Sequence, residues 1–84
     1  MNFEGRWKTK NGDTYTVVRL DRPGGMYSEG DEIYMTPDRA DLRWDRNGDA
    51  IQEGPSIYKY YETQWNRAQD YDLVERISEK DTRK

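Results

Sequence analysis

The sequence predicts a mainly β protein, either a small twisted antiparallel sheet or an SH3-like barrel of about five strands. Two Asn-Gly pairs, at residues 11–12 and 47–48, are each flanked by segments in which apolar and polar residues alternate. Asn-Gly favours a β-hairpin, because both central positions of a type I′ turn need positive φ. Aromatic residues make up 13% of the 84 residues. Each of them can bury a large area, so we expect a small aromatic core.

The first hairpin is expected over residues 3–20, with Asn11 and Gly12 as the two central residues of its turn. This register places Trp7 opposite Thr16. It also sorts the side chains into two faces, and a shift of one residue would destroy that sorting because successive residues of a strand point to opposite faces. The face expected to point inward carries Phe3, Gly5, Trp7, Thr9, Thr14, Thr16, Val18 and Leu20.

The remaining strands are expected in chain order. Residues 31–36 alternate over a short strand that Pro37 ends. A second hairpin is expected over residues 41–52, where the same two-residue turn places Trp44 opposite Ile51. The predicted core consists of Phe3, Trp7, Val18, Leu20, Ile33, Met35, Leu42, Trp44, Ile51 and Leu73.

Residues 56–69 fit two patterns. Apolar side chains recur at helical spacing, with Ser56 as the N-cap. Tyr and Thr residues of the same segment also alternate with period two, and both residue types favour strands. The prediction is one short helix over 56–69, with a strand as the alternative. A final strand is expected at residues 71–77.

The length of the chain fits a single β-rich domain, residues 1–78, followed by a disordered charged tail, residues 79–84. The sequence has no cysteine and no histidine, which excludes a disulfide framework and a thiolate metal site, and we expect no cofactor. Serine has no histidine to activate it, so we expect a protein that is not an enzyme. No apolar run approaches the roughly 20 residues of a membrane span, so a cytoplasmic location is expected.

A cluster of aromatic residues is the first candidate for a binding surface. Tyr58, Tyr60, Tyr61 and Trp65 lie close together in the sequence and cannot all face one core. Tyr and Trp often anchor protein interfaces, so the sequence predicts protein binding here. The other interpretation is a tyrosine-rich edge that covers the core and keeps its hydroxyls in water. Such a segment, or an exposed edge strand, could also pair two copies, which leaves monomer and homodimer open.

The polar face of the first hairpin is the alternative candidate. The predicted register places Arg6, Lys8, Tyr15 and Arg19 on this face. Basic residues around an aromatic platform are typical of surfaces that bind a nucleotide or a single-stranded nucleic acid. The other interpretation is an ordinary solvated face, since the outer faces of half-buried antiparallel sheets are usually charged. The net charge of −3 argues against non-specific nucleic-acid binding.

Three short segments resemble a widespread set of small phage and prophage proteins. Those proteins typically show a Thr-Arg-Asp-Gly-Arg opening, a Trp-x-x-Asp-Gly turn and a closing Asp-Leu-Val strand. The matching residues here are Thr9, Asn11, Gly12 and Asp13, then Trp44, Asn47 and Gly48, then Asp72, Leu73 and Val74. The chain departs from the pattern by having Asn where Asp is usual, and by the extra segment 54–69.

The resemblance implies a phage origin and a location in the host bacterial cytoplasm. Small phage proteins of this kind often bind and redirect host machinery or defence systems. Together with the aromatic cluster, this resemblance leads us to expect a non-enzymatic accessory protein that binds a host bacterial protein, as an inhibitor or an anti-defence factor.

Overall fold

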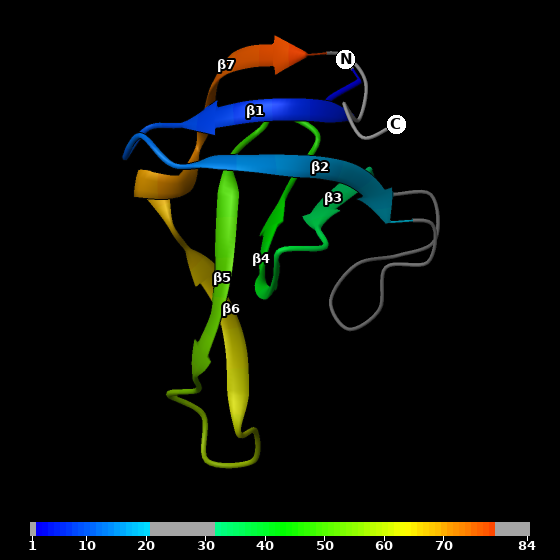
Figure 1. Ribbon diagram of the computed structural model, residues 1–84. Coiled ribbons are helices and arrows are strands. Elements are labelled where there is room, and N and C mark those ends of the chain that lie inside the picture. Colours follow the sequence, from blue (N-terminus) through cyan, green and yellow to red (C-terminus); the bar gives the residue numbers. More distant parts are fainter. Residues whose placement is uncertain (1, 21–31, 79–84) are drawn as a thin grey trace.

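The computed structural model describes residues 2–20 and 32–78 (Figure 1). The tail predicted at residues 79–84 and the first residue of the strand predicted at 31–36 lie outside the described residues. The prediction of a mainly β fold is confirmed, but the described residues form an open sheet of seven antiparallel strands rather than about five. The strands are β1 (Gly5–Thr9), β2 (Thr14–Leu20), β3 (Ile33–Thr36), β4 (Arg39–Trp44), β5 (Ala50–Pro55), β6 (Thr63–Arg67) and β7 (Leu73–Ser78). Their order across the sheet is β6-β5-β4-β3-β2-β1-β7.

The first hairpin turns on three residues rather than two, so its predicted register is wrong. The N–H of Gly12 donates to the carbonyl of Thr9 at 2.9 Å, and Gly12 has a φ of +94°. A type I turn followed by a left-handed glycine adds one residue to the loop. Trp7 therefore pairs with Tyr15 and not with Thr16. A shift of one residue exchanges the two faces of β2.

The second hairpin has the same geometry, and its predicted register is wrong for the same reason. The N–H of Gly48 donates to the carbonyl of Asp45 at 3.0 Å, and Gly48 has a φ of +80°. Trp44 pairs with Ala50 rather than with Ile51. Both hairpins thus contain one more loop residue than a type I′ turn provides.

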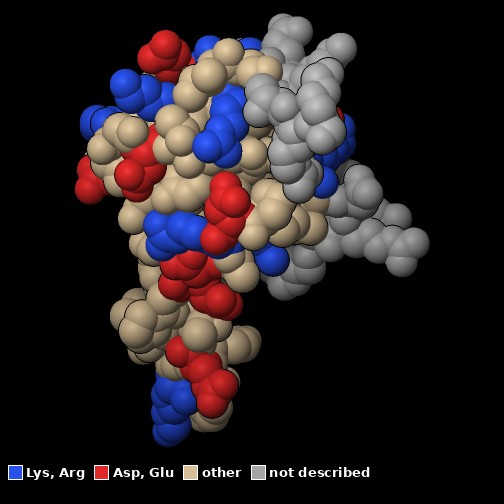
Figure 2. All heavy atoms as spheres, in the orientation of Figure 1, with Lys and Arg blue, Asp and Glu red and all other residues tan. Residues whose placement is uncertain are grey.

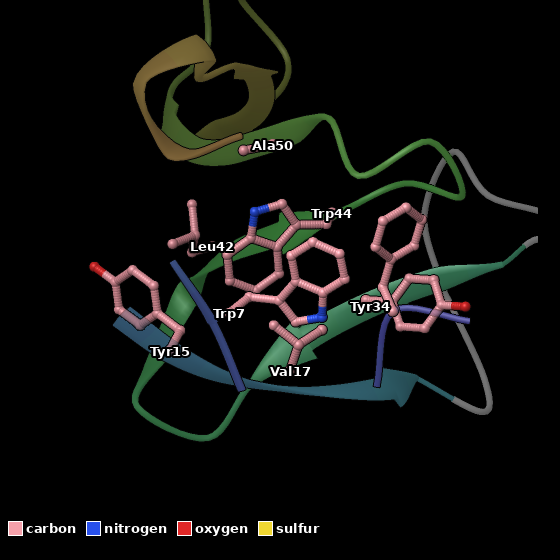
Figure 3. Close-up of a cluster of buried hydrophobic side chains, with 8 residues drawn as sticks. Trp7, Tyr15, Val17, Tyr34, Leu42, Trp44 and Ala50 are labelled. Atoms are coloured by element: carbon pink, nitrogen blue, oxygen red, sulfur yellow. The ribbon is translucent and has the colours of Figure 1, made fainter. Parts of the chain in front are cut away.

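The core lies between the two halves of the curled sheet. Figure 1 shows β1, β2 and β7 crossing the direction of β4 and β5, and Figure 3 shows the side chains packed between these strands. As predicted, each hairpin buries one tryptophan, with Trp7 5% and Trp44 0% exposed. The buried apolar residues are Phe3, Trp7, Tyr15, Val17, Ile33, Tyr34, Leu42, Trp44 and Ala50. The other predicted core residues, which are Val18, Leu20, Met35, Ile51 and Leu73, are only half-buried. The shifted registers explain why Val17 replaces Val18 and why Ala50 replaces Ile51.

The short helix predicted over residues 56–69 is wrong, and the strand alternative is correct for its second half. Residues 63–67 form β6, which pairs with β5 from Ile51↔Arg67 to Pro55↔Thr63 without a register shift. This ladder pairs the backbone groups of β5 and β6 that point toward each other. An isolated short helix would have had no packing partner to stabilise it.

The end of the chain departs slightly from its predicted limits. A 3-10 turn, η1 (Gln69–Tyr71), precedes β7 (Leu73–Ser78), so the strand predicted at 71–77 begins two residues later. η1 is the only helical element among the described residues. β7 pairs with β1 and completes the sheet on the side opposite β6.

The β5–β6 hairpin, which we call the ribbon (residues 50–67), extends well away from the rest of the sheet (Figure 1). The molecule is correspondingly elongated, with principal extents of 44 × 28 × 22 Å. Asp72 anchors the base of the ribbon. Its carboxylate accepts hydrogen bonds from both terminal nitrogens of Arg67 at 2.6 and 2.7 Å, and from the N–H of Ala50 at 2.8 Å. We call these three residues the latch.

Candidate functional site

The loop at the end of the ribbon carries four large and exposed side chains. Ile57, Tyr58, Tyr60 and Tyr61 are 81%, 61%, 84% and 68% exposed. We call these four residues the aromatic tip. Clustered exposed apolar groups commonly mark interaction sites, whereas scattered ones do not. The other exposed large hydrophobic side chains among the described residues are Val74 and Ile77, on β7.

The loop that carries the aromatic tip is held by its own hydrogen bonds. The N–H of Ser56 donates to the carbonyl of Glu62 at 3.1 Å and extends the β5–β6 ladder by one step. The side-chain oxygen of Gln64 accepts from the hydroxyl of Ser56 and from the N–H of Ile57, both at 3.2 Å. The hydroxyl of Ser56 in turn accepts from the N–H of Tyr58 at 2.9 Å. A loop ordered in this way loses little conformational entropy when it binds a partner.

The charges of the ribbon are separated along its length. Lys59 is the only basic residue between residues 50 and 66, and Glu53 and Glu62 are the acidic ones. Figure 2 shows basic atoms at the far end of the ribbon, with acidic atoms next to them and nearer the sheet. The ammonium of Lys59 lies 5.5 Å from the ring centroid of Tyr60, and within the described ranges it takes part in no ion pair. The far end of the ribbon therefore carries aromatic side chains and a single positive charge.

Trp65 does not belong to the aromatic tip, although it was predicted to share a surface with the tyrosines. It lies on β6, it is half-buried, and the guanidinium of Arg43 lies 4.5 Å from its ring centroid. The structure thus brings Tyr58, Tyr60 and Tyr61 together on one loop and places Trp65 behind them. Ile57 was not among the residues predicted for this surface, yet it has the second-highest exposure of the tip residues.

The basic surface predicted on the polar face of the first hairpin, which we call the basic strip (Arg6, Lys8, Tyr15 and Arg19), is not assembled. Tyr15, its intended aromatic platform, is only 8% exposed because the register of β2 is shifted by one residue. Arg6 points to the other face, where its guanidinium donates to the hydroxyl of Thr16 at 2.9 Å. Arg19 lies on the same face of β2 as Tyr15, because the two residues are four positions apart, and that face is opposite the one that carries Arg6 and Lys8.

Charged groups near the base of the ribbon are occupied by structural ion pairs. The guanidinium of Arg39 donates to both carboxylate oxygens of Asp41, at 3.0 and 2.8 Å. This bond holds the pKa of the Asp41 carboxyl below its ordinary value. The bond from Arg67 likewise lowers the pKa of Asp72. Both carboxylates therefore stay ionised near neutral pH, which suits a structural role better than general acid catalysis.

A polar hollow of about 400 Å³ lies beside the base of the ribbon. Its lining includes Gln52, Asn66, Arg67, Asp70 and Tyr71. Arg67 is already bonded to Asp72, and no set of three or more acidic side chains in the described part of the chain is placed to hold a metal ion. Within the same residues, no helix has the length and apolar character needed to cross a membrane.

Comparisons with protein-family models, with curated protein sequences and with solved structures find no match to this chain. Of the two surfaces expected from the sequence, only the tyrosines of the aromatic tip are gathered at one exposed place.

Proposed function

We propose that this protein is a non-enzymatic binding protein that captures another protein through the aromatic tip. The observation that carries this proposal is the exposure of Ile57, Tyr58, Tyr60 and Tyr61, at 61–84%, on a loop that projects from the sheet. Tyrosine supplies a large and rigid contact area with a polar end, and it is enriched at the energetic centres of interfaces. A projecting loop of this shape fits a concave surface on its partner.

The resemblance to small phage and prophage proteins supports a host bacterial protein as the partner. A projecting aromatic loop that enters a cleft would block that cleft, so inhibition of a host enzyme or defence protein is the proposed outcome. The place of action is then the bacterial cytoplasm.

Binding of a nucleotide or a single-stranded nucleic acid is the less favoured function. It requires Arg6 and Lys8 beside an exposed Tyr15, but Tyr15 is buried. The nucleic-acid hypothesis predicts an affinity that falls steeply with salt, because binding would release counterions. Protein capture through tyrosine side chains predicts a weaker salt dependence.

Affinity capture from bacterial lysate tests the proposal. The test variant carries Tyr58→Ala and Tyr60→Ala, and the matched control carries Val74→Ala and Ile77→Ala, which removes two other exposed side chains. We expect the tip variant to lose the captured protein and the control to retain it. Because all four side chains are exposed, each variant should unfold within about 1 kcal/mol of the unchanged protein.

Two results would contradict the proposal. One is equal capture by the tip variant and the unchanged protein. The other is a large loss of stability in the tip variant, which would assign the tyrosines to the core.

A further inference from the structure

The open sheet ends in two edge strands that differ in regularity. β7 pairs with β1 through two register shifts, whereas β6 pairs with β5 over its whole length without any. Bulges, proline and lysine are the usual protections of an edge strand against pairing with another chain. The sequence of β6, TQWNR, has neither proline nor lysine, and its one charge, Arg67, is bonded to Asp72. β6 is therefore the unprotected edge.

The backbone of β6 directs a regular row of donors and acceptors away from β5. The ladder contains the bond from the N–H of Ser56 to the carbonyl of Glu62, and the bond from the N–H of Ala68 to the carbonyl of Ala50. In an antiparallel pair, the residues that bond to the neighbouring strand alternate along the chain. The backbone N–H and C=O groups of the even-numbered residues of β6 thus point toward β5. Those that point their N–H and C=O outward are Thr63, Trp65 and Arg67.

We propose that β6 pairs with β6 of a second copy of this chain, antiparallel, around a twofold axis at Trp65. A twofold axis perpendicular to the sheet keeps each face on its own side, so residues that face each other must have numbers of the same parity. Centring on Trp65 pairs all the outward-directed residues, with Thr63 facing Arg67 of the second copy, and each pair exchanges both of its hydrogen bonds. An axis at Gln64 would leave Arg67 without a partner in the strand, and an axis at Asn66 would leave Thr63 without one.

The side chains that this register brings together are compatible. Trp65 faces Trp65 of the second copy, an aromatic cross-strand pair, and its ring is only half-buried in the single chain. Gln64 faces Asn66, so two carboxamides meet. No like charges lie opposite each other, because the only charged residue of β6 is Arg67 and it faces Thr63.

The dimer goes beyond the proposed function and is compatible with it. Pairing along β6 covers the side of the loop that leads into Thr63, where Glu62 faces Ala68 of the second copy. Ile57 and Tyr58 follow Pro55 on the β5 side and stay accessible to another protein. The two copies would carry their aromatic tips at opposite ends of the paired ribbons.

Amide hydrogen exchange of the unchanged protein tests the pairing residue by residue. As the concentration is raised toward about 1 mM, where weak interfaces associate, exchange at Thr63, Trp65 and Arg67 should slow at least about tenfold. Exchange at Gln64 and Asn66 should change much less, because their N–H groups already bond to β5. The sedimentation mass should rise from the 10.1 kDa of one chain toward twice that value.

A thiol variant tests the register. The chain has no cysteine, so Trp65→Cys introduces a single thiol. A hydrogen-bonded pair holds its Cα atoms about 5.5 Å apart, within the range of a disulfide. Under mild oxidation Trp65→Cys should form a covalent dimer at least about tenfold faster than Val74→Cys, on the β7 edge, because pairing raises the effective thiol concentration.

Three results would overturn the proposal. The unchanged protein could keep the mass of one chain throughout the concentration range. It could dimerise while the exchange at Trp65 stays constant. Val74→Cys could also crosslink as fast as Trp65→Cys, which would show collision or pairing elsewhere.

Discussion

Replacing Asp72 by alanine should destabilise the base of the ribbon. The carboxylate of Asp72 accepts the N–H of Ala50 at 2.8 Å and the guanidinium of Arg67 at 2.6 and 2.7 Å. It is the side chain that connects the start of β7 to both strands of the ribbon. Asp72→Ala removes every one of these bonds at once.

The expected cost follows from the two kinds of bond. Ala50 is fully buried, and a buried N–H left without an acceptor costs about 1–3 kcal/mol. The side chain of Arg67 is 47% exposed, so water screens its pair with Asp72, and that pair adds only about 0.5–1 kcal/mol. We expect Asp72→Ala to lower the free energy of unfolding by about 2–3 kcal/mol in urea titrations. Asp72→Asn keeps an acceptor for Ala50 and should lose less.

The same variant has a defined pH dependence. The pKa of Asp72 in the folded protein is lowered, mainly by the hydrogen bond from Arg67. Its stabilisation is therefore complete above the unfolded pKa of about 3.9 and is lost as the pH falls through the lower folded pKa. The difference in unfolding free energy between the unchanged protein and Asp72→Ala should be constant from pH 7 to about pH 5 and shrink below about pH 4. A difference under about 0.5 kcal/mol at pH 7, or one that grows in acid, would refute the assigned role of the latch.

The corrected register makes two further predictions, each measurable by urea unfolding. Tyr15→Ala should lower the free energy of unfolding by about 3–4 kcal/mol because Tyr15 is buried, whereas Thr16→Ala should lower it by less than about 1 kcal/mol. A larger loss for Thr16→Ala than for Tyr15→Ala would support the two-residue turn instead. Gly12→Ala should cost about 1 kcal/mol for its positive φ alone, since nothing lies within 4 Å of the added Cβ. Gly48→Ala should cost about 2–3 kcal/mol, because its Cβ would also approach the ring of Phe3 at 3.1 Å; equal losses at the two glycines would contradict this packing.

The hairpins could be predicted from the sequence, but the length of their turns could not. Asn-Gly suits both a two-residue type I′ turn and a three-residue loop that ends in a left-handed glycine. A signal was available in the second hairpin, at the residue before the turn. Asp45 stands first and Gly48 fourth in the second turn, as a type I turn prefers, and the Asp45 carboxylate accepts the N–H of Asn47 at 2.8 Å.

The wrong turn length exchanged the two predicted faces of the strand that follows the turn in each hairpin. Trp7 and Trp44 were correctly predicted to be buried because they precede the turn, where the alternation of the strand alone decides the face. Tyr15 and Ala50 follow the turn, so a one-residue error reversed their environment. The basic strip was lost for this reason, since Tyr15 was part of it.

The ribbon depends on pairing that local patterns do not reveal. Residues 56–69 carry helical and strand periodicities together, and β5 decides between them by pairing with β6. The exposure of the tyrosines could be anticipated, because four aromatic side chains in so short a segment exceed what one core can bury. Ile57 was missed, since an isoleucine beside tyrosines is usually part of the core.

The central claim is that the aromatic tip makes the decisive contact with a partner protein. Titration of the purified partner with the unchanged protein, with Tyr60→Ala and with Ile77→Ala tests that claim most directly, because both substitutions remove an exposed side chain. We predict that Tyr60→Ala raises Kd about 30-fold, the equivalent of about 2 kcal/mol, and that Ile77→Ala leaves Kd unchanged. A Kd for Tyr60→Ala equal to that of the unchanged protein, or an equal rise for Ile77→Ala, would contradict the claim.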